Sequence, residues 1–335
     1  MEGLPVLDVA PFLADPSSLE AKAFVDELRT ACHEVGFAHI VGHGIDPSLE
    51  TDLFSESRRF LNLPLATREQ LALVNSPAFR GYTRVGDEQT AGSADWRDQL
   101  DFGPEQLSPD PNELGPPWLR LRGPNQWPET VPNLGPLALE WLDNMLALGI
   151  QVLRALALAL GQPIDTFDSA FIPTHDLHAK IIRYPAGNPA TDQGVGLHHD
   201  SGLLTFILQS EIPGLEVRIN GDMTPIPPLA GAYVMNLGAM MQAASSGYFS
   251  ATPHRVTSPR GDQDRLSIAL FFNPAFESTF EALNLPPELA SQTRPEDVDL
   301  KGEPIHRVFG ENNLKVRLRS HPDVAARHYS DVVTP

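Results

Sequence analysis

The stretch that most constrains the fold of this chain runs from Gly196 to Gln209 and reads GLHHDSGLLTFILQ. Its Leu, Phe and Ile residues form an apolar, partly β-branched and aromatic run bounded by glycine, which predicts a short strand. Side chains on a strand alternate between its two faces, so we expect His198 and Asp200 to share one face and His199 to point to the other. One imidazole and one carboxylate therefore converge on the same point of a sheet.

The best candidate for a third side chain at this point is His254, in the sequence TPHRVT of residues 252–257. Two histidines and one carboxylate on one face, with three coordination positions left open, are typical of non-haem Fe(II) oxygenases. Ordinary strand histidines would explain His198 and His254 equally well if these residues stood alone. The segment that follows His254 favours the metal site.

Eleven residues after His254 the chain continues as RLSIALFFNP, from Arg265 to Pro274. By the same alternation, Arg265 and Ser267 share a face of this second strand. A guanidinium group offers a planar fork of donors, and a hydroxyl beside it completes a site suited to a carboxylate. This pair therefore predicts a site for a carboxylate ligand.

These three motifs together resemble the iron(II)/2-oxoglutarate dioxygenases of the isopenicillin N synthase-like family. The resemblance implies that His198, Asp200 and His254 bind Fe(II). It also implies that Arg265 and Ser267, with a tyrosine in the position of Tyr184, hold the distal carboxylate of 2-oxoglutarate. The implied reaction consumes O2, releases succinate and CO2, and hydroxylates, desaturates or cyclises a small-molecule substrate.

Three alternatives stay open at this point. Cyclising oxidases of the same group dispense with 2-oxoglutarate and can use the Arg-x-Ser pair for the carboxylate of their own substrate. An ethylene-forming type shares the same motifs. A jelly-roll binding protein without turnover is a more remote alternative, which succinate release would exclude. The presence of Asp200 disfavours a halogenase, because related iron halogenases lack this carboxylate.

The alternation of side chains also predicts part of the substrate pocket. If Tyr184 points inward, Ile182, Lys180 and His178 do so too, and Lys180 is expected to attract an anionic group of the co-substrate or substrate. In the family, the segment from about residue 79 to 102 lies over the mouth of the active site. The predicted pocket residues are Lys180, His178, Ile182, Phe271, Arg80, Tyr82 and Arg84.

From Leu177 onward the chain contains many short apolar segments separated by Gly and Pro, which indicates a β-sandwich or barrel. Resemblance sharpens this to a mainly β fold with flanking helices (α+β), with a double-stranded β-helix, or jelly-roll, core. We expect an N-terminal α/β region at 1–105, a connection with a long supporting helix at 106–175, the core at 176–280 and a C-terminal helix and tail at 281–335, in one compact unit. Helices are predicted over 17–35, 47–61 and 137–160, together with one short helix capped by Thr67 and a strand over 240–244.

Composition excludes several classes of partner. The 335 residues carry a net charge of -19, which argues against nucleic acid or an anionic membrane as a partner. The longest apolar stretch, 145–160, is interrupted by Gln151 and Arg154, so we interpret it as a buried helix. With Cys32 as the single cysteine, no intramolecular disulfide can form, and we expect a cytoplasmic protein that is a monomer or weak homo-oligomer.

Overall fold

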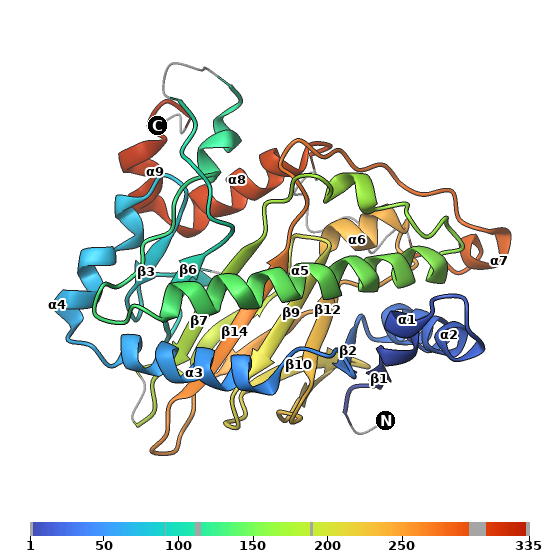
Figure 1. Cartoon of the computed structure of the whole chain (residues 1–335), viewed down its shortest axis with the longest axis horizontal. Coiled ribbons are helices and arrows are strands. Elements are labelled where there is room, and N and C mark those ends of the chain that lie inside the picture. Colours follow the sequence, from blue (N-terminus) through green and yellow to red (C-terminus); the bar gives the residue numbers. More distant parts are fainter. Residues whose placement is uncertain (1–2, 91, 111–114, 188–189, 295–305, 333–335) are drawn as a thin grey trace.

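The computed structural model describes residues 3–90, 92–110, 115–187, 190–294 and 306–332. Two β-sheets lie face to face, with helices covering the outer side of the larger one (Figure 1). From edge to edge, the larger sheet consists of β1 (Val6–Asp8), β2 (Phe37–Val41), β12 (Tyr233–Leu237), β9 (Leu204–Gln209), β14 (Arg265–Phe272), β7 (His178–Tyr184), β6 (Asp98–Phe102) and β3 (Gly81–Thr83). The smaller sheet consists of β11 (Asp222–Pro225), β10 (Leu215–Ile219), β13 (His254–Thr257) and β8 (Gln193–His198).

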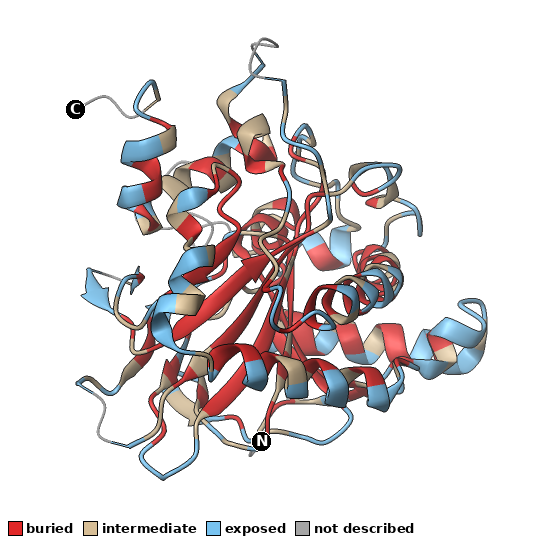
Figure 2. Cartoon of the chain, turned by 60° about the vertical axis from the view of Figure 1, so that its left-hand side comes forward, coloured by how far each residue is buried: buried red, intermediate tan, exposed pale blue. Residues whose placement is uncertain are grey.

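Except for the edge strand β1, the strands of the larger sheet are buried on both faces (Figure 2). On β14 the apolar side chains of Leu266, Ile268, Leu270 and Phe272 belong to the core under the helices. The residues between them face the smaller sheet. β7 shows the same division, because Ala179 and Ile181 join the helical core. One face of each strand thus stabilises the fold while the other is available for a site.

The long helix α5 (Leu134–Ala159) lies across the outer face of the larger sheet and also contacts α2 (Leu19–Glu34) and α3 (Pro47–Leu61) (Figure 1). By length and composition α5 would suffice to cross a membrane, but 61% of its most apolar window is buried inside the protein. Its Trp141 donates a hydrogen bond of 3.0 Å to the hydroxyl of Tyr233 on β12. Helix α5 is therefore the supporting helix that the sequence predicted.

Several local predictions agree with the structure. Helix α2 begins after Ser18, whose hydroxyl accepts a hydrogen bond from the backbone N–H of Ala21. Helix α3 has the predicted bounds. The Asn-Gly pair at residues 220–221, a sequence signal for a tight hairpin, forms the turn between β10 and β11, and the two residues have φ angles of 51° and 91°. Left-handed backbone at two adjacent residues is what a tight two-residue hairpin requires.

Three local predictions are wrong. The predicted strand at 240–244 is the helix α6 (Ala239–Ala244), since its alanines and methionines favour a helix over a strand. Thr67 caps no helix, because it lies inside α4 (Leu65–Arg68), which follows Pro64. The strand predicted from Gly196 to Gln209 is interrupted: β8 ends at His198 and β9 begins at Leu204.

The C-terminal helices α8 (Phe309–Ser320) and α9 (Pro322–His328) pack at the end of the sandwich near β3 and β6 (Figure 1). Helix α8 approaches the 3-10 helix of Pro117–Leu121 closely, since a Cβ on Gly310 would lie 2.5 Å from the ring of Trp118. The remaining short elements are α1 (Ala10–Ala14), α7 (Pro287–Ala290), and the hairpin strands β4 (Gln89–Thr90) and β5 (Ser93–Ala94).

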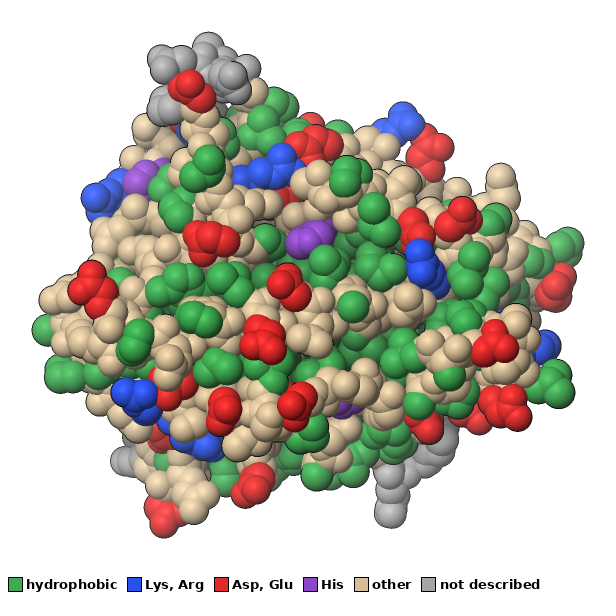
Figure 3. Space-filling view, viewed as in Figure 1, with side chains coloured by type: hydrophobic (Ala, Val, Ile, Leu, Met, Phe, Trp, Pro, Cys, Tyr) green, Lys and Arg blue, Asp and Glu red, His purple; other side chains and the backbone are tan. Residues whose placement is uncertain are grey.

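The helical face of the molecule carries many acidic and few basic side chains (Figure 3). This distribution agrees with the net charge of -19. A negatively charged surface repels anions, so any binding site for an anion must depend on basic side chains gathered locally.

Gly149 tests how tightly α5 packs on the sheet. A Cβ at this position would overlap the ring of Phe272, which stacks on Phe171 and so cannot withdraw. Alanine is favoured over glycine in a helix by about 0.5–1 kcal/mol, but overpacking a core costs about 1–3 kcal/mol. We therefore expect Gly149→Ala to lower the free energy of unfolding by about 1–2 kcal/mol in urea denaturation. The loss should be smaller in a Phe272→Leu background, and equal losses in both backgrounds would contradict the contact.

Candidate active site

A cavity of about 560 Å³ lies between the two sheets. Its wall combines β7, β9 and β14 of the larger sheet with β8, β10 and β13 of the smaller one. It is completed by the helix α8 and by Glu88, Gln89, Thr90, Gly92 and Arg97. Residues that are more than two hundred positions apart in the sequence therefore border one cavity.

His198, Asp200 and His254 meet at this cavity. His198 is the last residue of β8, His254 is the first of β13, and the two are direct partners across the smaller sheet. Asp200 lies in the turn that follows β8. One ligand atom from each of the three residues lies within 4.8 Å of the others, which makes this a possible metal site. The interruption of the predicted strand thus brings the carboxylate between the two imidazoles.

Backbone carbonyls fix the orientation of both imidazoles. The Nδ1 atom of His198 lies 2.8 Å from the carbonyl oxygen of Gly196, and that of His254 lies 3.1 Å from the carbonyl oxygen of Thr252. A carbonyl oxygen only accepts, so each Nδ1 carries a proton and each Nε2 presents a lone pair. The two Nε2 atoms lie 3.6 Å and 3.8 Å from Oδ1 of Asp200.

The carboxylate of Asp200 is oriented by two neighbours. Its Oδ2 atom accepts hydrogen bonds from the hydroxyl of Thr205 at 2.5 Å and from the side-chain amide of Asn236 at 2.8 Å. This leaves Oδ1 directed at the imidazoles. Burial alone would raise the pKa of Asp200, but hydrogen bonding to His198 and the nearby His254 hold that pKa well below its usual range.

These donors fit a divalent first-row metal ion. Bonds from such an ion to imidazole nitrogen or carboxylate oxygen are about 2.0–2.2 Å, so one ion can bridge donors separated by the distances observed here. Burial, followed by the proximity of His198, lowers the pKa of His254 to about 4, which keeps its imidazole neutral and able to bind a metal at neutral pH. Two imidazoles and one carboxylate are the donor set typical of Fe(II).

Arg265 lies in the same cavity, and its side chain is almost completely buried. Its guanidinium group donates to the hydroxyl of Ser267 at 3.2 Å and to the side-chain oxygen of Gln209 at 2.8 Å. It also lies over the ring of Tyr184, 4.8 Å from the centroid. Among the described residues no carboxylate pairs with Arg265. A buried cation without a protein anion is a site for an anionic ligand.

Comparison with known proteins decides the family. Residues 177–274 match the family model described as the 2OG-Fe(II) oxygenase superfamily, and residues 4–130 match the model described as the non-haem dioxygenase in morphine synthesis N-terminal region. The chain belongs to the 2OG-Fe(II) oxygenase superfamily. It is a 2-oxoglutarate-dependent dioxygenase that oxidises a small molecule, with Fe(II) and 2-oxoglutarate as cofactors.

Two relatives and one solved structure illustrate the similarity. The chain is 33% identical to the 2-oxoglutarate-dependent dioxygenase frbJ of Dothideomycetidae sp. (strain 11243), over 97% of this chain and 92% of that protein. It is 31% identical to the homoarginine-6-hydroxylase 2-ODD-233 of Oryza sativa subsp. japonica, over 84% of this chain and 88% of that protein. A full-length Neurospora crassa protein, solved in complex with alpha-KG and thymine, has a TM-score of 0.75, with 22% identity over 93% of this chain and 97% of that one. This likeness confirms the predicted α+β class with its double-stranded β-helix core.

The structure places three of the predicted pocket residues on the cavity wall: Lys180, Ile182 and Phe271. The ammonium group of Lys180 is paired, since it lies 2.9 Å from Oε1 of Glu88. His178 lies on the same face of β7 but is not among the residues that line the cavity. Its ring is bonded to Asp101 at 2.8 Å. Contact of these residues with a substrate stays a prediction.

The expectation that Arg80, Tyr82 and Arg84 border the substrate is corrected, because none of them lines the cavity. Arg80 is buried behind the wall, where it donates to the carbonyl oxygen of Phe102 at 2.8 Å. Tyr82 belongs to the helical core on the other face of the sheet and donates to Asp98. Arg84 is exposed and pairs with an acidic side chain three residues away.

The segment does reach the cavity, but through Glu88 and Arg97 rather than through residues 80–84. Arg317 and His321, at the C-terminal end of α8, border it from the other side. The sequence analysis missed all four residues. The spacing of Arg317 and His321, four residues apart and hence on one face of a helix, was the one local signal available for them.

Asn236 provides a test of how the carboxylate is held. Asn236→Leu keeps the volume but removes a hydrogen bond from Oδ2 of Asp200, so the carboxylate loses part of its fixed orientation. Loss of such a supporting partner typically weakens metal binding by about 10- to 100-fold. We expect a loss of this size in anaerobic titration with Fe(II).

His199→Ala is the matched control for this titration. The Nδ1 atom of His199 is bonded to the carbonyl of Ala251 at 2.7 Å, and His199 is not among the three metal donors. This variant should retain its iron. Equal iron affinity in Asn236→Leu and the wild type would show that the amide does not orient Asp200.

Proposed function

We propose that the protein hydroxylates a small-molecule substrate, with Fe(II) held by His198, Asp200 and His254 and the distal carboxylate of 2-oxoglutarate held by Arg265 with Ser267 and Tyr184. The observation that carries this proposal is that one cavity is bordered by the three metal donors and by the guanidinium group of Arg265, which has no carboxylate partner among the described residues. The iron and 2-oxoglutarate, when bound, supply the oxidation of a substrate C–H bond by O2, with release of succinate and CO2.

The residues of the chain hold the metal donors in a fixed orientation. The carbonyls beside His198 and His254 hold both imidazoles in one tautomer, and Thr205 and Asn236 hold one oxygen of Asp200 away from the metal position. Polar groups that are fixed before the reaction do not have to reorganise during it.

The cavity wall between the two ligand sites is apolar. Ile182, Leu215, Val256 and Ala269 belong to the core between the sheets and line the cavity. An apolar wall lowers the local dielectric constant and strengthens the pairing of Arg265 with an anionic co-substrate.

Hydroxylation is the outcome that the comparisons favour among those open to the family. The rice relative at 31% identity is named a hydroxylase. A 2-oxoglutarate-independent oxidase is disfavoured, because frbJ at 33% identity is named a 2-oxoglutarate-dependent enzyme. Ethylene formation and desaturation use the same metal donors and are separated from hydroxylation by product analysis.

We also propose a monomer or weak homo-oligomer in the cytoplasm with no nucleic-acid or membrane partner. The net charge of -19 opposes binding to polyanions. Cys32 is buried, and burial raises the pKa of its thiol, so it remains a small apolar core residue rather than a reactive group.

Replacement of His254 with Ala tests the proposed metal site. It should abolish iron-dependent succinate formation and leave the fold largely intact, because two apolar cores, and not the metal, hold the sheets together. Iron content, succinate release and far-UV circular dichroism are measured on the same preparation. A His254→Ala protein that binds iron stoichiometrically and releases succinate at the wild-type rate would show that the third ligand is misassigned.

Replacement of Arg265 tests the proposed 2-oxoglutarate site. A hydrogen bond to a charged group contributes about 1.5–3 kcal/mol, and about 1.4 kcal/mol corresponds to a factor of ten in affinity. Arg265→Leu should therefore weaken 2-oxoglutarate by about ten- to a hundredfold or more, chiefly in its KM. Arg265→Lys should restore only part of this, since an ammonium group cannot reproduce the planar fork.

Ser267→Ala removes one neutral donor and should weaken the affinity for 2-oxoglutarate less than either change at Arg265. Oxygen consumption by the wild type, measured with and without 2-oxoglutarate, can contradict the proposed role of Arg265. If it proceeds equally well without 2-oxoglutarate, Arg265 holds a carboxylate of the substrate itself.

A further inference from the structure

The part of the cavity wall that lies away from the metal donors is rich in basic side chains. Arg97, Lys180, Arg317 and Arg319 line it, and Glu88 is the one carboxylate besides Asp200 among the described lining residues. This local excess of positive charge contrasts with the net charge of -19 of the whole chain. Buried cations are costly unless anions accompany them, so the partner of each cation has to be identified.

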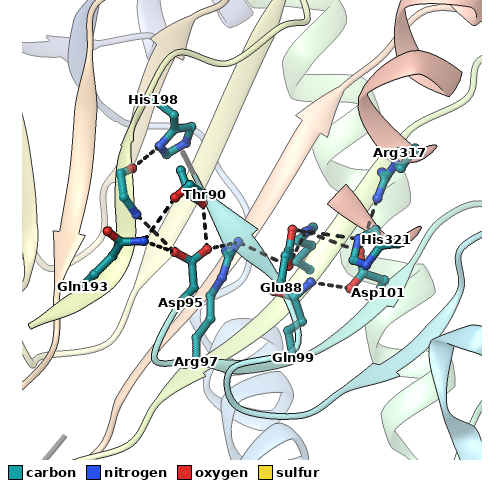
Figure 4. Close-up of polar contacts among 12 residues, drawn as sticks. Glu88, Thr90, Asp95, Arg97, Gln99, Asp101, Gln193, His198, Arg317 and His321 are labelled. Carbon is teal, nitrogen blue, oxygen red and sulfur yellow. Dashed lines mark hydrogen bonds and ion pairs between the residues drawn. The ribbon is translucent and has the colours of Figure 1, made fainter. Parts of the chain in front are cut away.

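Glu88 accounts for two of these cations, Lys180 and Arg97. Its carboxylate lies 2.9 Å from the ammonium group of Lys180 and 3.2 Å from the guanidinium group of Arg97 (Figure 4). Arg97 has a second partner in Asp95, at 3.1 Å. Burial would raise the pKa of Glu88, but Arg97 and Lys180 hold it well below its usual range. Glu88 is thus a carboxylate already engaged by the protein.

Arg317 has a more distant ion-pair partner than Lys180 or Arg97. Its ion-pair partner among the described residues is Asp101, at 3.5 Å, which is at the outer limit of a hydrogen bond. Asp101 already accepts shorter hydrogen bonds from His178 at 2.8 Å and from Gln99 at 2.7 Å. A guanidinium group has five N–H donors, so most of the binding capacity of Arg317 remains for a ligand in the cavity.

His321 provides an independent observation at the same end of the cavity. It lies one helical turn after Arg317, lines the cavity, and is buried. Its Nε2 atom has no hydrogen-bond partner among the described residues, and the nearest carboxylate oxygen, on Glu88, is 3.9 Å away. A buried polar atom without a partner costs free energy, which a ligand atom in the cavity would recover.

We propose that the primary substrate is a small organic acid whose carboxylate binds to Arg317 and His321 at the α8 end of the cavity. This inference rests on the proposed function, because it places the substrate in the cavity that also holds iron and 2-oxoglutarate. The co-substrate carboxylate has its own site at Arg265, where Ser267 and Tyr184 surround it. The group at Arg317 is therefore a second anion.

A cationic substrate at Glu88 is the rival arrangement. It would have to displace Lys180 or Arg97 from contacts of 2.9 Å and 3.2 Å. Lys180 would then keep only the longer contact of 3.7 Å to Asp101. An anion at Arg317 displaces nothing comparable, since it competes only with the contact of 3.5 Å to Asp101. The charges of the wall therefore favour an acid over an amine.

The test uses the full-length protein loaded with Fe(II) and 2-oxoglutarate in the absence of oxygen. The probes are straight-chain and aryl-substituted monocarboxylates, each compared with its primary amide and its amine of the same skeleton. Affinity is measured by calorimetry and checked by the shift in thermal midpoint. We expect at least one acid to bind at least about tenfold more tightly than its amide, as a charge-assisted hydrogen bond predicts.

Arg317→Gln should abolish this preference for the acid while the affinity for 2-oxoglutarate stays unchanged. Arg317→Lys should keep part of the preference, because it keeps the charge without the fork. The matched control is Arg327→Gln on α9, which removes an exposed guanidinium group that donates to Asn75 and does not line the cavity. This control should bind the acids as the wild type does.

The inference is overturned if no acid binds better than its amide, if the amines bind best, or if the preference persists in Arg317→Gln. Binding of Fe(II) and 2-oxoglutarate is measured first, on each protein. Failure at that step contradicts the proposed function itself, whereas failure of the acid preference in a protein that binds both contradicts only the substrate class.

Discussion

The alternation of side chains on β7 and β14 is the constraint on which the rest of the structure depends. One face of these strands buries Leu, Ile, Ala and Phe under α5, and the other presents Arg265, Ser267, Tyr184 and Lys180 to the cavity. Burial of charged groups is costly, so the apolar face must stabilise the sheet enough to offset it. A register shift of one residue would exchange the two faces and remove core and site together.

The sequence was sufficient to predict the site residues whose placement follows from their spacing along the chain. His198 and Asp200 are two residues apart, and Arg265 and Ser267 share a face whatever lies beside them. Prediction from the sequence failed where pairing with a neighbouring strand determines the direction of a side chain. Tyr82 points to the helical core because of how β3 pairs with β6, which no local pattern reveals. Glu88 and Arg317 become neighbours of one cavity only through the fold.

The interruption after His198 shows a second limit of local reasoning. Alternation along a continuous strand predicted that His198 and Asp200 converge, and they do, yet Asp200 lies in a turn and not on the strand. The turn runs close beneath the backbone at Gly238, where a Cβ would overlap the carbonyl oxygen of Gly202. Glycine at position 238 therefore allows the approach that places Asp200 beside Asn236 and Thr205.

Metal donors and the charged wall form one connected set of polar contacts. The ring of His198 is bonded to the carbonyl of Gly196, whose own N–H donates to Asp95 at 3.3 Å. Asp95 pairs with Arg97, and Arg97 with Glu88, so the contacts run from a metal donor to the wall opposite α8 (Figure 4). Members of such a network hold one another in position, and changes within it do not add independently. Asp95 and Arg97 are therefore shared by the contacts of the metal donors and those of the charged wall, and substitutions at these two residues are expected to combine non-additively.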